Sequence, residues 1–304
     1  MITAVSPATV TCLVLALLMC LAVGIAGASE KPKGAPFVIQ SHRGAGNLAP
    51  ENTIQSFELA WRIGTVPEAD VRATSDWVIV AFHDNDLQRL APTASPDIRS
   101  KSVNALPWST VRELDVGSYK GPEYKNQRIA RISEVLDAMK GHPARWLYMD
   151  VKEVPLDKLA DLVRERGVDK QVILASTKYD QLRQWKKLLP HSKTLLWMGE
   201  NEPRLRERMA ELRATAFADI TQLQIHVNVG DVAAPEPFAP SSAFLRDVTT
   251  EIRPKGILFQ VLVKGSDNPQ AYRKLMDLGV ESFATDDPLV TLEVMRKHSA
   301  PKQQ

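Results

Sequence analysis

The feature that most constrains the fold is the alternation of short β-branched runs with amphipathic stretches along the chain. The short runs predict strands, and the longer periodic stretches between them predict helices. Strands that alternate with helices indicate βα units and a parallel sheet. The eight predicted strands are Phe37–Ser41, Val66–Ala73, Trp146–Val151, Val172–Ser176, Thr194–Met198, Gln222–Val227, Ile257–Val263 and Ser282–Thr285. Eight such units close most simply into a ring, so we predict an α/β fold, a (β/α)8 TIM barrel.

Three of the predicted helices end beside a glycine, the residue best suited to a left-handed C-terminal cap. They are Glu51–Ile63 before Gly64, Leu156–Arg166 before Gly167, and Pro269–Leu278 before Gly279. Between Asp84 and Ile132 the chain is instead rich in Pro and Ser, with weak periodicity. This segment predicts a small insertion after the second strand, at about residues 85–131.

The N-terminal 28 residues contain no Asp, Glu, Lys or Arg, and Val10–Ala26 is almost wholly apolar. The A-x-A-like sequence Ala26-Gly27-Ala28 follows, which predicts a signal peptide and export to the periplasm or the extracellular medium. The alternative is an uncleaved segment that anchors the protein in a membrane, because the apolar run is close to a membrane-spanning length. The predicted organisation is signal peptide 1–28, linker 29–35, barrel 36–300 and tail 301–304.

Cysteine usage and charge exclude several classes of site. Cys12 and Cys20 both fall in the presequence, so the mature chain holds no disulfide and no thiolate metal site. The formal net charge of +2 gives no reason to expect nucleic acid as a partner. The sequence does not predict an oligomeric state.

Carboxylates gather at the ends of two predicted strands. Glu68 and Asp70 are two residues apart, so both side chains point to the same face of their strand. Asp150 and Lys152 repeat this spacing on the third strand. Functional groups of a barrel lie at the carboxyl ends of its strands, and oxygen ligands suit Mg²⁺ or Ca²⁺. On either strand alone, such a pair is commonly just a polar edge.

Two histidines follow apolar runs directly. His42 comes after Phe37–Ser41, and His83 comes after the run 78–82, so we expect both imidazoles at the carboxyl end of a strand. Histidine is suited to proton transfer near neutral pH. The neighbouring Arg43 guanidinium and the Lys152 ammonium are suited to phosphate oxygens.

The other histidines fit ordinary structural roles better. A histidine at a strand end often bonds only to main-chain groups, and this interpretation is favoured for His142, His191 and His298. His226 is left open, because it falls late in the sixth predicted strand, where its ring could reach the same edge of the barrel.

The chemistry-bearing residues also form ordered motifs that span nearly the whole chain after the presequence. They are His42-Arg43-Gly44, Pro50-Glu51-Asn52-Thr53, Glu68-x-Asp70-Val71, Thr74-x-Asp76, His83-Asp84-x-x-Leu87-x-Arg89, Leu114-Asp115-x-Gly117-Ser118, Asp150-x-Lys152 and Thr285-Asp286-x-Pro288. This series resembles the glycerophosphodiester phosphodiesterase family, within the phosphatidylinositol phospholipase C-like phosphodiesterase superfamily.

The resemblance implies a barrel enzyme that uses one divalent cation, Mg²⁺ or Ca²⁺, to cleave small-molecule glycerophosphodiesters into an alcohol and glycerol 3-phosphate. It leaves open a peripheral contact with lipid. By the resemblance, each group of residues has one role: Glu68, Asp70 and Asp150 as metal ligands, His42 and His83 as the acid and base pair, and Arg43 and Lys152 on the substrate phosphate.

Departures from the family pattern leave alternatives open. Asp150 stands where the family usually has Glu, and Gln260–Lys264 replaces an aromatic-Thr-Val-Asn run on the seventh strand. One alternative is a lysophospholipase D or sphingomyelinase D-like enzyme that releases cyclic phosphate, for which Trp108 and Tyr119 of the insertion offer an apolar approach. A further alternative is a barrel that binds phosphodiesters without turning them over.

Overall fold

The computed structural model describes residues 38–265 and 268–299. The predicted signal peptide (1–28), linker (29–35) and tail (301–304) lie outside these residues, as does Phe37 of the first predicted strand. Within the described ranges, no helix combines the length and the apolar character needed to cross a bilayer. The structure therefore bears on the barrel and its insertion.

Eight parallel strands form a closed barrel, as predicted. In chain order they are β1 (Val38–Ser41), β2 (Val66–Ala73), β4 (Leu147–Val151), β5 (Val172–Ser176), β6 (Lys193–Met198), β7 (Gln222–Val229), β9 (Leu258–Lys264) and β10 (Ser282–Thr285). The ring closes because β1 pairs with both β2 and β10 in parallel. Three strands have the predicted bounds, and β4, β6, β7 and β9 differ by one or two residues at one or both ends. The predicted start of β1 lies outside the described residues.

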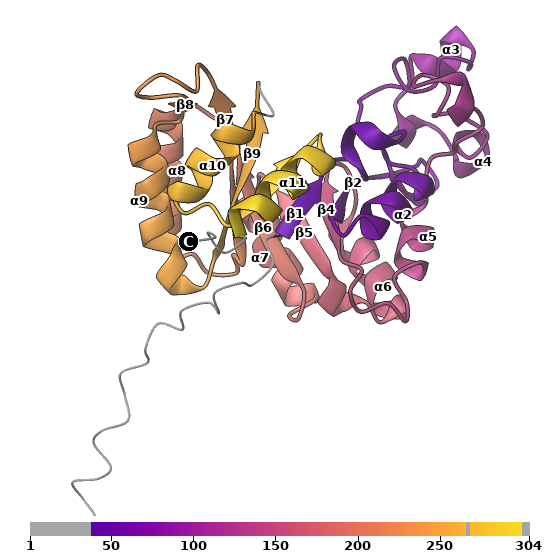
Figure 1. Ribbon diagram of the computed structural model, residues 1–304. Coiled ribbons are helices and arrows are strands. Elements are labelled where there is room, and N and C mark those ends of the chain that lie inside the picture. Colours follow the sequence, from indigo (N-terminus) through magenta and orange to yellow (C-terminus); the bar gives the residue numbers. More distant parts are fainter. Residues whose placement is uncertain (1–37, 266–267, 300–304) are drawn as a thin grey trace, which may run out of the picture. The chain divides into compact units, whose positions relative to one another are not determined.

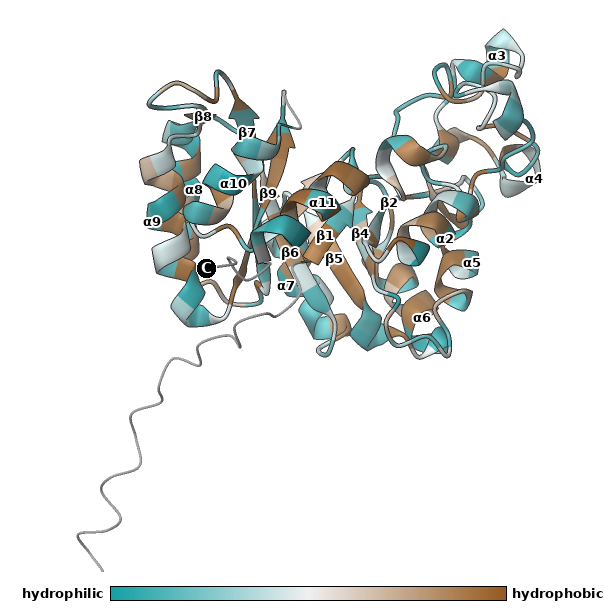
Figure 2. Cartoon of the chain, in the orientation of Figure 1, coloured by the Kyte–Doolittle hydropathy of each residue, from teal (hydrophilic) through white to brown (hydrophobic). Residues whose placement is uncertain are grey.

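Helices cover the outside of this ring. They are α2 (Ile54–Arg62), α5 (Ile132–Asp137), α6 (Leu156–Arg166), α7 (Tyr179–Leu188), α8 (Glu202–Ala214), α9 (Ser242–Ile252), α10 (Pro269–Asp277) and α11 (Pro288–Ser299). Figure 1 shows α8, α9 and α10 beside strands β7 and β9. Apolar residues concentrate on strands such as β5 and β9, whereas polar residues cover much of α8 and α9 (Figure 2). The main core lies between these two layers.

The caps explain where the helices begin and end. Gly64, Gly167 and Gly279 all have positive φ, as predicted for left-handed caps. The first helix begins three residues later than predicted, after Thr53, whose side chain accepts a hydrogen bond from the N–H of Ser56. The reason is the preceding residues, which form a turn in which Asn52 has a φ of 56° and is therefore not helical.

Polar side chains fill part of the barrel interior. Tyr148 donates from its hydroxyl to Gln222 Oε1 at 2.8 Å, and Gln260 Nε2 donates to Ser282 Oγ at 2.8 Å. These groups are buried, and each is satisfied by a neighbour from another strand. Because side chains alternate along a strand, the next inward positions of β2, β4 and β7 lie one layer closer to the carboxyl ends. The polar layer thus forms the floor of the barrel mouth.

The predicted insertion has a small core of its own. A hairpin strand, β3 (Ile79–Ala81), returns antiparallel to β2. The chain then forms the short helices α3 (Pro96–Arg99) and α4 (Trp108–Val111), which lie apart from the barrel strands in Figure 1. Buried residues of this segment pack together, among them Phe82, Leu87, Leu90, Val103, Val111 and Ile129. Trp108 and Tyr119 pack against this cluster. A further short strand, β8 (Phe238–Ala239), pairs antiparallel with β7.

Candidate active site

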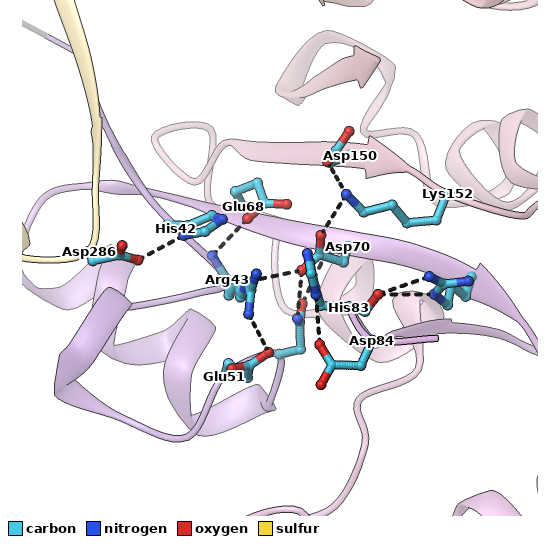
Figure 3. A network of polar contacts seen from close by, with 12 residues as sticks. His42, Arg43, Glu51, Glu68, Asp70, His83, Asp84, Asp150, Lys152 and Asp286 are labelled. Atoms are coloured by element: carbon cyan, nitrogen blue, oxygen red, sulfur yellow. Dashed lines mark hydrogen bonds and ion pairs between the residues drawn. The ribbon is translucent and has the colours of Figure 1, made fainter. Parts of the chain in front are cut away.

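Three carboxylates converge at the mouth of the barrel, as Figure 3 shows. Glu68 and Asp70 lie on β2, and Asp150 lies directly opposite Asp70 on the neighbouring strand β4. One oxygen from each of the three lies within 4.8 Å of the others. As predicted, Glu68 and Asp70 lie on the same face of β2. Parallel pairing with β4 brings Asp150 and Lys152 beside them.

Burial and mutual repulsion act on the pKa values of these three carboxylates. Glu68 and Asp70 are only 2% and 1% exposed. Burial, reinforced by the charge of Asp70, raises the pKa of Glu68 to about 8. Burial and the charge of Asp70 also raise the pKa of Asp150. For Asp70 burial acts in the same direction, but the positive charges of Lys152 and His83 outweigh it and lower the pKa.

The chemistry of these groups fits a divalent cation. All three donors are carboxylate oxygens, which hard cations such as Mg²⁺ and Ca²⁺ prefer. Among the described residues, Glu68 Oε1 is a buried oxygen that receives no hydrogen bond, an arrangement that costs free energy unless another positive group approaches it. Glu68, Asp70 and Asp150 therefore fit the ligand set that the sequence indicated.

Two cationic side chains border the carboxylates. Lys152 Nζ donates to Asp150 Oδ2 at 2.6 Å and lies 3.2 Å from Asp70 Oδ1. Burial alone lowers the pKa of Lys152, but these carboxylates raise it above its usual value, so the ammonium stays charged. The main-chain N–H of Arg43 donates to Glu68 Oε2 at 2.7 Å. Among the described residues, Arg43 Nε is buried without a hydrogen-bond acceptor and lies 3.8 Å from Asp70 Oδ2, so this donor could serve an anion.

His42 enters the site from β1 and is held by the last strand of the barrel. Its Nδ1 lies 2.7 Å from Asp286 Oδ1, just after β10, and its main-chain N–H donates to Thr285 O at 3.0 Å. Burial alone lowers the pKa of His42, but the hydrogen bond to Asp286 and the charges of Glu68 and Asp286 raise it overall. With Nδ1 engaged, Nε2 is the ring nitrogen left for proton transfer.

His83 reaches the site from a hairpin strand outside the parallel ring. The apolar run before it forms β3, a hairpin strand antiparallel to β2, and not a strand of the parallel ring. The hairpin brings the chain back toward the carboxylates, since Phe82 N donates to Asp70 O at 2.8 Å. The imidazole Nδ1 lies 2.8 Å from Oδ1 of the next residue, Asp84. The imidazole follows the carboxyl end of a strand, as expected, and that strand is the hairpin strand β3.

An ion-pair network fixes the carboxylate of Asp84. Arg89, from the insertion, donates to both oxygens of Asp84 at 2.7 and 2.8 Å. The same guanidinium donates to both oxygens of Glu51 at 2.7 and 2.9 Å, and Arg43 Nη1 donates to Glu51 Oε1 at 3.1 Å. Burial alone raises the pKa of Asp84, but the bonds from Arg89 and His83 hold it at about 2. Glu51 thus links the two arginines, and Figure 3 shows its contact with Arg43.

Sequence reasoning gave no individual role to several residues that the structure places here. Asp84, Asp286, Glu51 and Arg89 form the contacts just described, and Asn52 donates from Nδ2 to Asp70 Oδ2 at 2.9 Å. All five fall inside motifs that the sequence analysis quoted, so the signal was present. Their roles depend on contacts between distant segments, which the motifs alone do not specify.

The remaining histidines lie in two different environments. His142, His191 and His298 are exposed. His226, whose role was left open, lies on β7 at the barrel mouth with its Nε2 3.2 Å from Gln224 Oε1. Burial, together with the charge of Lys264, lowers the pKa of His226 to about 3, so the ring is neutral. Among the residues that the structure describes, its ring contacts Gln224 and Trp197 and has no carboxylate partner, unlike the two site histidines.

A cavity opens beside these groups. Its volume is about 460 Å³, and Arg72, His83, Asp84, Asn85, Asp86 and Lys152 line it. Small-molecule sites commonly occupy volumes of this order. The cavity therefore gives a small ligand access to one of the two histidines and to the ammonium that contacts the carboxylates.

Comparisons with known proteins agree with this arrangement. The model of the glycerophosphoryl diester phosphodiesterase family matches residues 42–290. A glycerophosphodiester phosphodiesterase of Caldanaerobacter subterraneus subsp. tengcongensis is 26% identical over 270 residues, covering 86% of this chain and 98% of the relative.

Two solved structures share the fold. The glycerophosphodiester phosphodiesterase of Agrobacterium tumefaciens has a TM-score of 0.65 at 22% identity, covering 84% of this chain and 98% of that one. A phosphodiesterase of Oleispira antarctica, in complex with the product sn-glycerol-3-phosphate, has a TM-score of 0.62 at 22% identity, covering 85% and 96%. At this identity the likeness shows the barrel fold. Because the family model matches most of its length, the chain belongs to the glycerophosphoryl diester phosphodiesterase family.

Proposed function

We propose that the protein hydrolyses glycerophosphodiesters to an alcohol and glycerol 3-phosphate, with a divalent cation, Mg²⁺ or Ca²⁺, held by Glu68, Asp70 and Asp150. The observation that carries the proposal is a pair of histidines, each paired through Nδ1 with its own aspartate, at the edge of a buried carboxylate cluster. A binding module has no need of two such pairs. Membership of the family supports the same reaction.

The chain's residues divide the chemistry among them. His42 and His83 serve as the acid and base pair: one protonates the departing alcohol oxygen, and the other accepts a proton from the attacking nucleophile. Because each Nδ1 is engaged by a carboxylate, both rings present Nε2 for this transfer. Arg43 and Lys152 bind the phosphate and offset the negative charge that develops on its oxygens. The cation, when bound, polarises the phosphate oxygens as a Lewis acid.

The related Oleispira structure supports the substrate class, because that protein is in complex with sn-glycerol-3-phosphate. In the present chain, the cavity of about 460 Å³ beside His83 and Lys152 has room for a small alcohol next to the phosphate. An apolar approach of a lipid to the site over Trp108 and Tyr119 is not favoured, since both side chains pack against the core of the insertion.

Product analysis tests the proposal. The protein, cleared of metal with EDTA and then supplied with Mg²⁺ or Ca²⁺, is incubated with glycerophosphocholine and, separately, with lysophosphatidylcholine, and products are followed by phosphorus NMR. We expect cation-dependent glycerol 3-phosphate from the first substrate. Cyclic phosphate or lysophosphatidate from the second alone would assign the protein to the phospholipase D-like class. Binding of both without turnover would make it a phosphodiester-binding barrel.

We also propose that the protein is exported, with cleavage of residues 1–28. The support is the sequence pattern of this segment, which carries no charged residue and ends in Ala26-Gly27-Ala28. Mass spectrometry of the N-terminus of protein recovered from the producing cells provides the measurement. A chain that begins at Ser29 is the expected result, whereas one that keeps Met1 indicates the anchored alternative.

A further inference from the structure

The indole of Trp197 contacts the third carboxylate of the cluster. Trp197 lies on β6, and its Nε1 donates to Oδ1 of Asp150 at 3.0 Å. Lys152 Nζ donates to the other oxygen, Oδ2, at 2.6 Å. The two oxygens of Asp150 are therefore held by donors from two segments, β6 and the residue after β4, and the carboxylate plane cannot rotate without losing one of these bonds.

The other two carboxylates are held by uncharged donors in the same way. The main-chain N–H of Arg43 donates to Glu68 Oε2, and Asn52 Nδ2 donates to Asp70 Oδ2. The second oxygen of Glu68 receives no bond among the described residues, and that of Asp70 lies 3.2 Å from Lys152 Nζ. Each carboxylate thus has one oxygen fixed by a neutral N–H. For Asp150, this neutral donor is the indole N–H of Trp197.

The indole is itself held in place. The ring of His226 stacks on Trp197, with 4.9 Å between ring centroids and an angle of 7° between the planes. Gly199 leaves room for this stack, since a Cβ there would lie 2.8 Å from His226 Nδ1. On the barrel side, Trp197 packs against the buried cluster that includes Tyr148 and Leu195. An indole packed in this way presents its N–H in one direction.

We propose that Trp197 is a positioning residue, which orients the Asp150 carboxylate and thereby sets the affinity of the cluster for its divalent cation. The inference rests on the proposed function, because it takes the cluster to be a cation site. Hydrogen bonds to a ligating carboxylate fix its orientation before the cation arrives, and their loss typically costs 10–100-fold in metal affinity or activity. Trp197 itself need not touch the cation or the substrate.

Calorimetric titration of the metal-free protein with Mn²⁺, a divalent ion that accepts oxygen ligands, tests the proposal. Trp197→Phe removes the N–H and keeps an aromatic ring to stack on His226. Trp61→Phe is the matched control, because Trp61 Nε1 also donates one hydrogen bond, at 2.8 Å, but to the main-chain oxygen of Trp146. Chemical denaturation of each variant without metal measures stability separately.

We expect Trp197→Phe to weaken Mn²⁺ binding by about tenfold, and Trp61→Phe to leave it unchanged. Turnover by Trp197→Phe is expected to recover toward the wild-type kcat when Mn²⁺ is raised above its new Kd. Wild-type affinity in Trp197→Phe, with or without lost stability, would overturn the inference.

Glu68→Gln separates this failure from failure of the proposed function. If the wild type binds Mn²⁺ no better than Glu68→Gln, the cluster is not a cation site, and the proposed function and the inference fall together. If Glu68→Gln weakens binding and Trp197→Phe does not, only the positioning role is wrong.

Discussion

The two histidines of the site are held by different parts of the molecule. His42 and its partner Asp286 are 244 residues apart in sequence and meet because β1 and β10 are adjacent in the barrel. His83 and Asp84 are consecutive, and Arg89 of the insertion fixes the aspartate. One pair is positioned by the sheet and the other by an ion pair. The insertion is thus a structural part of the proposed site.

Removal of either imidazole tests whether both pairs are needed. His42→Ala and His83→Ala are each expected to lower kcat/KM by about 10²- to 10⁴-fold, since each removes a proton-transfer group. Near-native circular dichroism is expected for both, because the two rings lie at the open end of the barrel and add little to its core. Near-wild-type turnover in either variant would remove that histidine from the acid and base pair.

The role of the insertion can be tested through its arginine. Arg89→Met is expected to lower kcat/KM by about 10- to 100-fold, because Asp84 and Glu51 lose the guanidinium that aligns them. Arg112→Met is the control, since Arg112 is in the same insertion and its guanidinium pairs with its exposed neighbour Glu113 at 3.0 Å. Equal activity in the two variants would mean that the insertion does not align His83.

The barrel-held pair has its own test in the pH dependence of activity. Asp286 raises the pKa of His42, so Asp286→Asn is expected to lower that pKa and to move the corresponding limb of the kcat/KM profile to lower pH. Asp287→Asn is a suitable control, because that neighbouring carboxylate accepts a hydrogen bond from the N–H of Val290 at 3.5 Å and not one from His42. A profile that does not move would show that Asp286 does not set the protonation of His42.

The smallest effect on chemistry is expected inside the insertion. Asp115 accepts hydrogen bonds from Gly117 N, Ser118 N, Ser118 Oγ and Asn126 N. Asp115→Ala is expected to destabilise the protein by about 2 kcal/mol, the scale of hydrogen bonds to a charged group, and to lower activity less than Arg89→Met does. Urea denaturation gives the first quantity. Asp97→Ala, at an exposed ion pair with Lys101, is expected to change stability little.

The ionisation of Asp115 should also make the free energy of unfolding depend on pH. Burial alone raises the pKa of Asp115, but its hydrogen bonds hold it at about 2, below the value of about 3.9 for an unfolded aspartate. Its contribution is therefore complete above the unfolded pKa and lost as the pH falls through about 2. The difference in stability between wild type and Asp115→Ala should shrink over that range, and a constant difference would point to another cause.

Sequence patterns located most of the fold because the alternation of strands and helices is a local signal. β2, β5 and β10 have the predicted bounds. The apolar run that forms β3 did not indicate how this strand pairs, because a short apolar run is compatible with both parallel and antiparallel pairing. Likewise the spacing of Glu68 and Asp70 predicted their common face, whereas the indole donor to Asp150 comes from a strand 47 residues away. Such a contact depends on barrel closure, which no local pattern encodes.

The pairing of β2 with β4 places Asp70 directly opposite Asp150. Adjacent strands lie about 4.8 Å apart, so the sheet itself sets the spacing of these two carboxylates. A slip of one residue in this pairing would turn one of them away from the mouth. On the proposed function, the cation therefore binds only chains in which β2 and β4 pair in this register. At 100 times its Kd it would stabilise them by about 2.7 kcal/mol. The concentration of free cation would then set part of the free energy of unfolding as well as the rate of turnover.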